Sequence, residues 1–171
     1  MFQLKKEPSG FCQKALDTAR LAFDHNGEHS PIVLTNHETF GVGCISVAGI
    51  PKDLVSRLMR MMAKTCDEIV YISEAWIVQR QASDPKSEDL KKQMQRMAEF
   101  AERQDLSEHP DRTEVLLIMW STSDREVMAT ARIERLGSSK PRLGEWDYMD
   151  TGNPETCVEG RFTNIYREEN E

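Results

Sequence analysis

The feature that most constrains the fold is the run from Asp67 to Gln79, the longest stretch of β-forming residues in this 171-residue chain. Side chains alternate between the two faces of a strand, and here most side chains on both faces are apolar. The run also lies between two segments with helical periodicity. We therefore expect it to be the central strand of a sheet that is covered on both faces.

One carboxylate, Glu74, lies in the middle of an apolar row of this strand. A charge in that position is costly unless it is paired or neutralised. One interpretation makes Glu74 a general base or metal ligand in a pocket beside Trp76. The other, which we favour, is a buried ion pair with Arg132 as the preferred partner. The residues expected to share the face of Glu74 are Val70, Ile72, Trp76 and Val78.

The rest of the pattern predicts one α+β domain over residues 1–171, with a loose arm at 1–8 and a solvated tail at 167–171. The prediction is a mainly antiparallel sheet of about six strands, with two helices packed on one face. A third, densely charged helix over 87–103 is expected at an edge of the sheet or over the other face. Helices are expected at 11–25 and 51–66, and strands at 32–35, 40–48, 67–79, 114–121, 125–136, 143–149 and 161–166.

The helix over 51–66 joins two strands of the predicted sheet, so it is expected to form a right-handed crossover. Its periodicity predicts one buried stripe. The residues of that stripe are Leu54, Val55, Leu58, Met61, Met62 and Cys66.

Composition and charge narrow the function classes. A net charge of −7 repels phosphate backbones, so nucleic-acid binding is not expected. The longest apolar run, at 115–120, is far too short to span a bilayer, and the first ten residues do not resemble a signal peptide. Neither the membrane nor secretion is therefore expected, and the predicted location is the cytoplasm. The four scattered cysteines are expected to be reduced.

No cofactor or metal site is expected. His25, His29 and His37 crowd one region with Glu38 and are of ligand type. However, Gly27 and Pro31 interrupt any helix that would align the first two histidines, and no His-Glu-x-x-His motif occurs. Loop histidines are the favoured interpretation.

A small-molecule groove is a further hypothesis. Trp76, Trp120 and Trp146 all fall on predicted strands, and their rings would line one groove with Glu74 and Arg132 if the strands were suitably paired. Aromatic residues on strands are more often core residues. Arg112 precedes the strand expected at 114–121 and could bind an anionic ligand. The alternative is an ion pair with a neighbouring acidic residue.

Three segments carry a resemblance: Ser73-Glu74-Ala75-Trp76, Pro110-Asp111-Arg112-x-Glu114-Val115 and Pro141-Arg142-Leu143-Gly144. Together they resemble a pattern found in small uncharacterised bacterial and phage proteins. The resemblance covers about residues 67–150 and implies no activity, cofactor or partner.

Two function classes follow. The favoured prediction is a non-catalytic binding or accessory protein, with a homodimer as one form, because no nucleophile–base pair or phosphate loop is recognisable. The alternative is a small hydrolase or lyase that uses Glu74 as acid or base, with Arg132 or Arg112 holding an anionic substrate. The sequence leaves the choice between them open.

Overall fold

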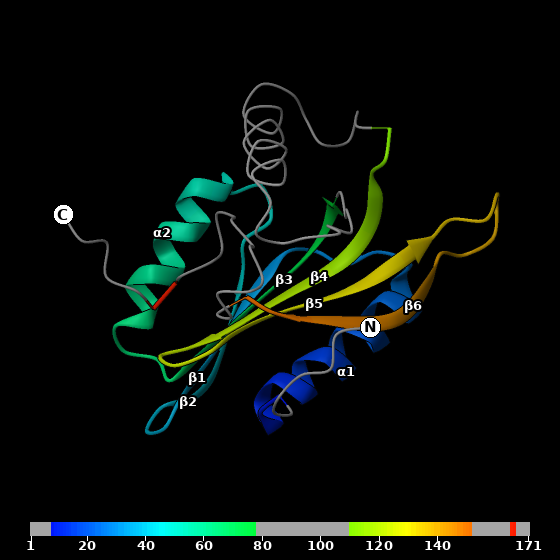
Figure 1. Ribbon diagram of the computed structural model, residues 1–171. Helices are drawn as coiled ribbons and strands as arrows, with labels where there is room; N and C mark the ends of the chain where they lie inside the picture. The colour runs from blue at the N-terminus through cyan, green and yellow to red at the C-terminus, as the bar shows by residue number, and fades with distance from the viewer. Residues whose placement is uncertain (1–7, 78–109, 152–164, 167–171) are drawn as a thin grey trace, which may run out of the picture.

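The computed structural model describes residues 8–77, 110–151 and 165–166 (Figure 1). In this part of the chain, six strands form one antiparallel sheet in the order β2-β1-β3-β4-β5-β6. The predicted α+β class and six-stranded antiparallel sheet are thus confirmed. The elements are α1 (Gly10–Asn26), β1 (Ile32–His37), β2 (Gly41–Ser46), α2 (Lys52–Ala63), β3 (Glu68–Ile77), β4 (Thr113–Thr122), β5 (Glu126–Glu134) and β6 (Arg142–Asp150).

Strand β3 occupies the centre of the sheet, as predicted. It pairs with β1 along one side and with β4 along the other, where the ladder runs without interruption from Glu68 to Ile77. Its side chains divide between two buried clusters: Val70 and Ile72 enter one, while Ile69 and Tyr71 enter the other. Both faces of the strand are therefore covered, as its apolar sequence predicts.

The prediction that the two helices pack on one face is wrong. Helix α1 buries Leu16, Ala19 and Phe23 in the cluster that contains Val70 and Ile72. Helix α2 instead buries Val55 and Met59 against the opposite face, with Ile69 and Tyr71. Figure 1 shows the two helices on opposite sides of the sheet. The reason is that a sheet apolar on both faces needs a separate cover for each.

The path of α2 follows from the strand order. Strands β2 and β3 are both antiparallel to β1, which lies between them, so they are parallel to each other. A connection between parallel strands has to cross a face of the sheet, and α2 is that connection. The predicted right-handedness stays a prediction.

The buried stripe of α2 differs from the expected one. Val55 is buried as predicted, but Leu54 and Met61 are exposed, and Met59 is fully buried in their place. Val55 and Met59 are four residues apart and therefore lie one above the other on the same side of the helix. The apolar residues of α2 cover a broad part of its surface, and the orientation of the helix on the sheet decides which of them are buried.

Helix α1 is closed at both ends. The Ser9 side chain accepts a hydrogen bond from the Cys12 N–H, and Gly27 adopts a left-handed conformation with φ 78° at the C-terminal end. Lys140, from the loop between β5 and β6, donates to the carbonyl oxygens of Asp24 and His25. The contacts of Lys140 therefore attach the C-terminal end of α1 to the loop between β5 and β6.

Several predictions lie outside the described residues. These are the charged helix over 87–103, most of the arm at 1–8, the tail at 167–171 and most of the strand expected over 161–166. Ile165 and Tyr166, which are described, form a turn. Among the helices of the described segments, none is long and apolar enough to cross a membrane.

Candidate functional site

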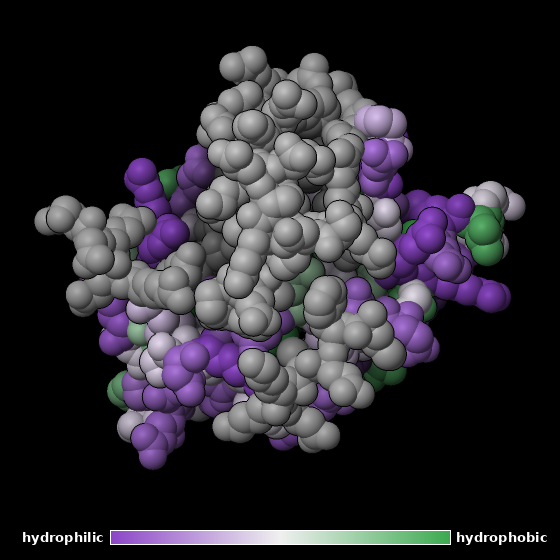
Figure 2. Space-filling view, viewed as in Figure 1, coloured by the Kyte–Doolittle hydropathy of each residue, from purple (hydrophilic) through white to green (hydrophobic). Residues whose placement is uncertain are grey.

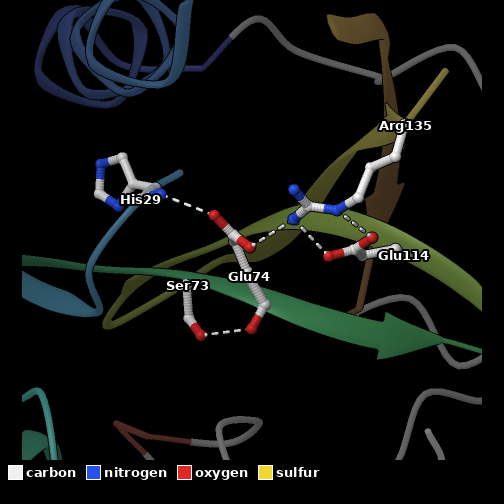
Figure 3. A network of polar contacts seen from close by, with 5 residues as sticks. All are labelled: His29, Ser73, Glu74, Glu114 and Arg135. Atoms are coloured by element: carbon white, nitrogen blue, oxygen red, sulfur yellow. Dashed lines mark hydrogen bonds and ion pairs between the residues drawn. The ribbon is translucent and has the colours of Figure 1, made fainter. Parts of the chain in front are cut away.

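Glu74 lies in a network of polar contacts on the α1 side of the sheet (Figure 3). Its Oε1 accepts a hydrogen bond of 2.6 Å from the backbone N–H of His29, and its Oε2 lies 3.2 Å from the guanidinium of Arg135. Arg135 also donates twice to Glu114 on β4, at 2.7 and 2.8 Å. Both oxygens of Glu74 therefore have a partner, and one guanidinium serves two carboxylates.

The guanidinium that meets Glu74 belongs to Arg135, so Arg132 as the preferred partner was wrong. Glu74 lies opposite Leu116, which lies opposite Ala131, and directly opposed residues share a face. Arg132, the next residue, therefore points to the other face, where it is exposed. Arg135 follows the end of β5 with the same parity as Ala131. Strand alternation places Arg135 and Arg132 on opposite faces, but which of these faces Glu74 shares depends on the register.

The electrostatics of this network favour charge pairing. Hydrogen bonding to Glu114, followed by the charges of Glu114 and Glu74, raises the pKa of Arg135 above its ordinary value, although slight burial opposes this. Burial lowers the pKa of His29, while the nearby Glu74 charge opposes the decrease. The side chains are 45% exposed for Arg135, 24% for Glu74 and 18% for Glu114. The network is thus a partly solvated ion cluster at the rim of the core.

The three tryptophans do not line one groove, although all three lie on the α1 side of the sheet. Trp120 lies opposite Val70, six positions along the strand from Trp76, which corresponds to about 20 Å. Trp146 lies opposite Ala131, three strand spacings or about 14 Å from Glu74 across the sheet. The strand register therefore separates the three tryptophans, whose relative positions the sequence alone did not determine.

Each tryptophan instead has an arginine over its ring. Arg112 lies 5.1 Å from the centre of the Trp76 ring, Arg20 lies 5.3 Å from that of Trp146, and Arg125 lies 5.4 Å from that of Trp120. These are cation–π distances. Arg112, which was predicted as a candidate to bind an anionic ligand, thus packs on Trp76.

The histidines lie in separate places. His25 is in the last turn of α1, and His29 belongs to the loop that reaches Glu74. His37 closes the turn between β1 and β2, where its Nδ1 accepts hydrogen bonds from the N–H groups of Thr39 and Phe40. In the described residues, no three histidine, cysteine or acidic side chains are grouped so that they could hold a metal ion.

Sequence reasoning missed a second carboxylate on the same face, Glu68. Its Oε1 accepts from the Asn36 amide at 3.1 Å, and its Oε2 accepts from the Trp120 indole N–H at 2.8 Å and from the Ser9 hydroxyl. Ser9 is the N-cap of α1, so Glu68 lies at the positive end of the helix dipole. The sequence could have indicated this residue, because Glu68 is an even number of positions from Glu74 in the same strand and therefore lies on the same face.

A third carboxylate, Glu126, is buried on the α2 side of β5. Its Oε1 accepts the backbone N–H of Ile165 at 2.9 Å and the Ser121 hydroxyl at 3.4 Å. Ile165 is itself buried in the α2-side cluster. This acid therefore attaches a late segment of the chain to the sheet.

In the described contacts these carboxylates accept hydrogen bonds, and Glu74 and Glu114 share the Arg135 cation. The predicted resemblance to small uncharacterised bacterial and phage proteins stays a prediction. No known family, curated protein or solved structure matches this chain.

Proposed function

We propose that this chain is a non-catalytic binding or accessory protein that acts in the cytoplasm. The observation that supports the proposal best is the engagement of Glu74, the leading catalytic candidate. A general base needs an oxygen directed at the proton that it removes. In Glu74 one oxygen accepts the His29 N–H, and the other meets a guanidinium that Glu114 shares.

The alternative is a hydrolase or lyase that uses Glu74 with an arginine as anion clamp. Arg132 is on the opposite face of the sheet from Glu74, and Arg112 lies over Trp76. Arg135 is the cation that meets Glu74, at 3.2 Å from its Oε2. Enzymatic use of Glu74 would require an anionic substrate to displace this contact.

Thermal melts separate the two functions. We expect Glu74→Gln to melt about 2–4 °C below the wild type, because a partly exposed ion pair contributes about 1 kcal/mol. Neither protein should respond to EDTA, divalent metals or small anions. The matched control is Glu145→Gln, which removes the same charge from an exposed position on β6.

The opposite result would support the enzyme. A mutant that melts at or above the wild-type temperature, with a ligand-induced shift only in the wild type, would mean that Glu74 is retained at a cost in stability. That result would overturn the structural engagement of Glu74, the observation that supports the proposal best.

A further inference from the structure

The two edges of the sheet differ in charge. Edge strand β6 carries four charged residues, and its pairing with β5 contains a register shift at Ala131 to Ile133. Edge strand β2, with the sequence Gly-Val-Gly-Cys-Ile-Ser, carries none and pairs with β1 without a shift. Charges and bulges are the usual means of preventing edge-to-edge association. Within the described residues, β6 has this protection and β2 does not. The charged residues of β6 are Arg142, Glu145, Asp147 and Asp150.

The backbone direction of β2 follows from one hydrogen bond. The Val47 N–H donates to the Pro31 carbonyl, so this opposed pair is of the hydrogen-bonded type. Hydrogen-bonded and non-hydrogen-bonded pairs alternate along an antiparallel ladder. The backbone groups of Gly41, Gly43 and Ile45 are therefore directed to β1, and those of the even-numbered residues are directed outward. The outward-directed residues are Val42, Cys44 and Ser46.

We propose that two copies of this chain associate through antiparallel pairing of their β2 strands about a twofold axis perpendicular to the sheet. In the proposed register Cys44 lies opposite Cys44 of the second copy, and Val42 lies opposite Ser46. Every outward N–H and C=O of the three residues then has a partner. The result is a continuous sheet across both copies.

A second copy is the occupant that the charges favour. The chain carries a net charge of −7, so two copies repel each other wherever their acidic surfaces meet. Pairing through β2 brings no charged residue of one strand opposite a charged residue of the other. The exposed Val42 side chain, 66% accessible, would gain apolar contacts across the new ladder.

Other exposed apolar side chains surround this edge. The strand itself contributes Ile45, and the flanking residues Phe40 and Ile50 are exposed as well. On the side of the molecule seen in Figure 2, the described surface is mainly hydrophilic, with small separate hydrophobic groups. The dimer goes beyond the function proposed above, because it depends on β2 and not on Glu74.

Mass measurement by size-exclusion chromatography with light scattering tests the dimer. We expect the wild type to be a dimer, and Cys44→Lys to be a monomer because it places two like charges directly opposite each other. The matched control is Leu136→Lys, which adds the same charge at another exposed apolar position and should stay dimeric. A monomeric wild type, or a dimer that survives Cys44→Lys, would overturn the proposal.

Disulfide trapping tests the register without depending on that variant. Opposed residues of a hydrogen-bonded pair have Cα atoms about 5.5 Å apart, within the range of a disulfide. Cys44 is free and exposed, so oxidised glutathione should link two wild-type chains and should not link Cys44→Ser. In the Cys44→Ser background, Val42→Cys and Ser46→Cys should cross-link only when the two variants are mixed. Equal cross-linking of Cys44→Ser, or of each variant alone, would contradict the register.

Discussion

Glu68 and Glu74 lie on the same face of β3, six positions apart, and their surroundings differ in kind. Glu68 accepts hydrogen bonds from three neutral groups, an amide, an indole and a hydroxyl. Glu74 accepts one backbone N–H and meets a guanidinium. The first holds α1, β1 and β4 to the start of β3, and the second joins loop residues at its other end. Of the two, Glu68 has the more structural position.

The difference teaches where a partly buried carboxylate contributes most to stability. A carboxylate served by neutral donors leaves those donors without a partner when it is removed, and Trp120 is almost fully buried. A carboxylate paired with a half-exposed arginine is replaced by water at lower cost. Glu74, which stands out in the sequence, is therefore expected to contribute less to stability than Glu68, which does not.

The largest expected effect is that of Glu68→Ala. We expect it to lower the free energy of unfolding by about 3 kcal/mol, because it leaves the Trp120 indole, the Asn36 amide and the Ser9 hydroxyl without this acceptor. Urea denaturation followed by circular dichroism measures this, with Glu74→Ala as the matched variant. A larger loss for Glu74→Ala would reverse the comparison.

A smaller effect is expected from Arg135. Arg135→Met should lower the free energy of unfolding by about 1–2 kcal/mol, since it leaves Glu74 and Glu114 near each other without their shared cation. Arg132→Met, on the opposite face and exposed, should stay within about 0.5 kcal/mol of the wild type. The Arg135→Met loss should shrink at high salt. Equal losses for the two variants would argue against the ion cluster.

The smallest effect concerns pH at the Glu68 end. Burial, followed by the Glu68 charge, raises the pKa of Cys12 from 9.0 to about 12, although Arg125 opposes the increase. The thiol thus keeps its proton longer in the folded state than in the unfolded chain. Its contribution to stability is complete below pH 9 and is lost as the pH rises towards 12.

Comparison of the wild type with Cys12→Ala measures this contribution. The difference in unfolding free energy between the two proteins should be constant below pH 9 and should shrink between pH 9 and 12. Burial raises the pKa of Tyr71 in both proteins alike, whereas the pKa of Tyr148 is raised by burial and also by the Cys12 charge. A difference that stays constant across that range would contradict the shift.

The sequence by itself determined the elements and the central strand. Alternation over Asp67 to Gln79 predicted a strand covered on both faces, and β3 is that strand. Helical periodicity placed α1 and α2. These features depend on neighbours in the chain, so local spacing is sufficient to predict them.

Only the tertiary structure decided which groups meet. Glu74 and Arg135 are 61 residues apart, Ser9 and Glu68 are 59, and each contact depends on strand register and on the face that a helix covers. A shift of one residue in register moves every side chain to the other face. Because the register is not contained in the sequence of one strand, Arg132 was predicted in place of Arg135. Because the face that a helix covers is not contained in its periodicity, both helices were expected on one side. The spacing of residues along the chain predicts whether a segment is a helix or a strand. It does not predict how that helix or strand is aligned with its neighbours in space.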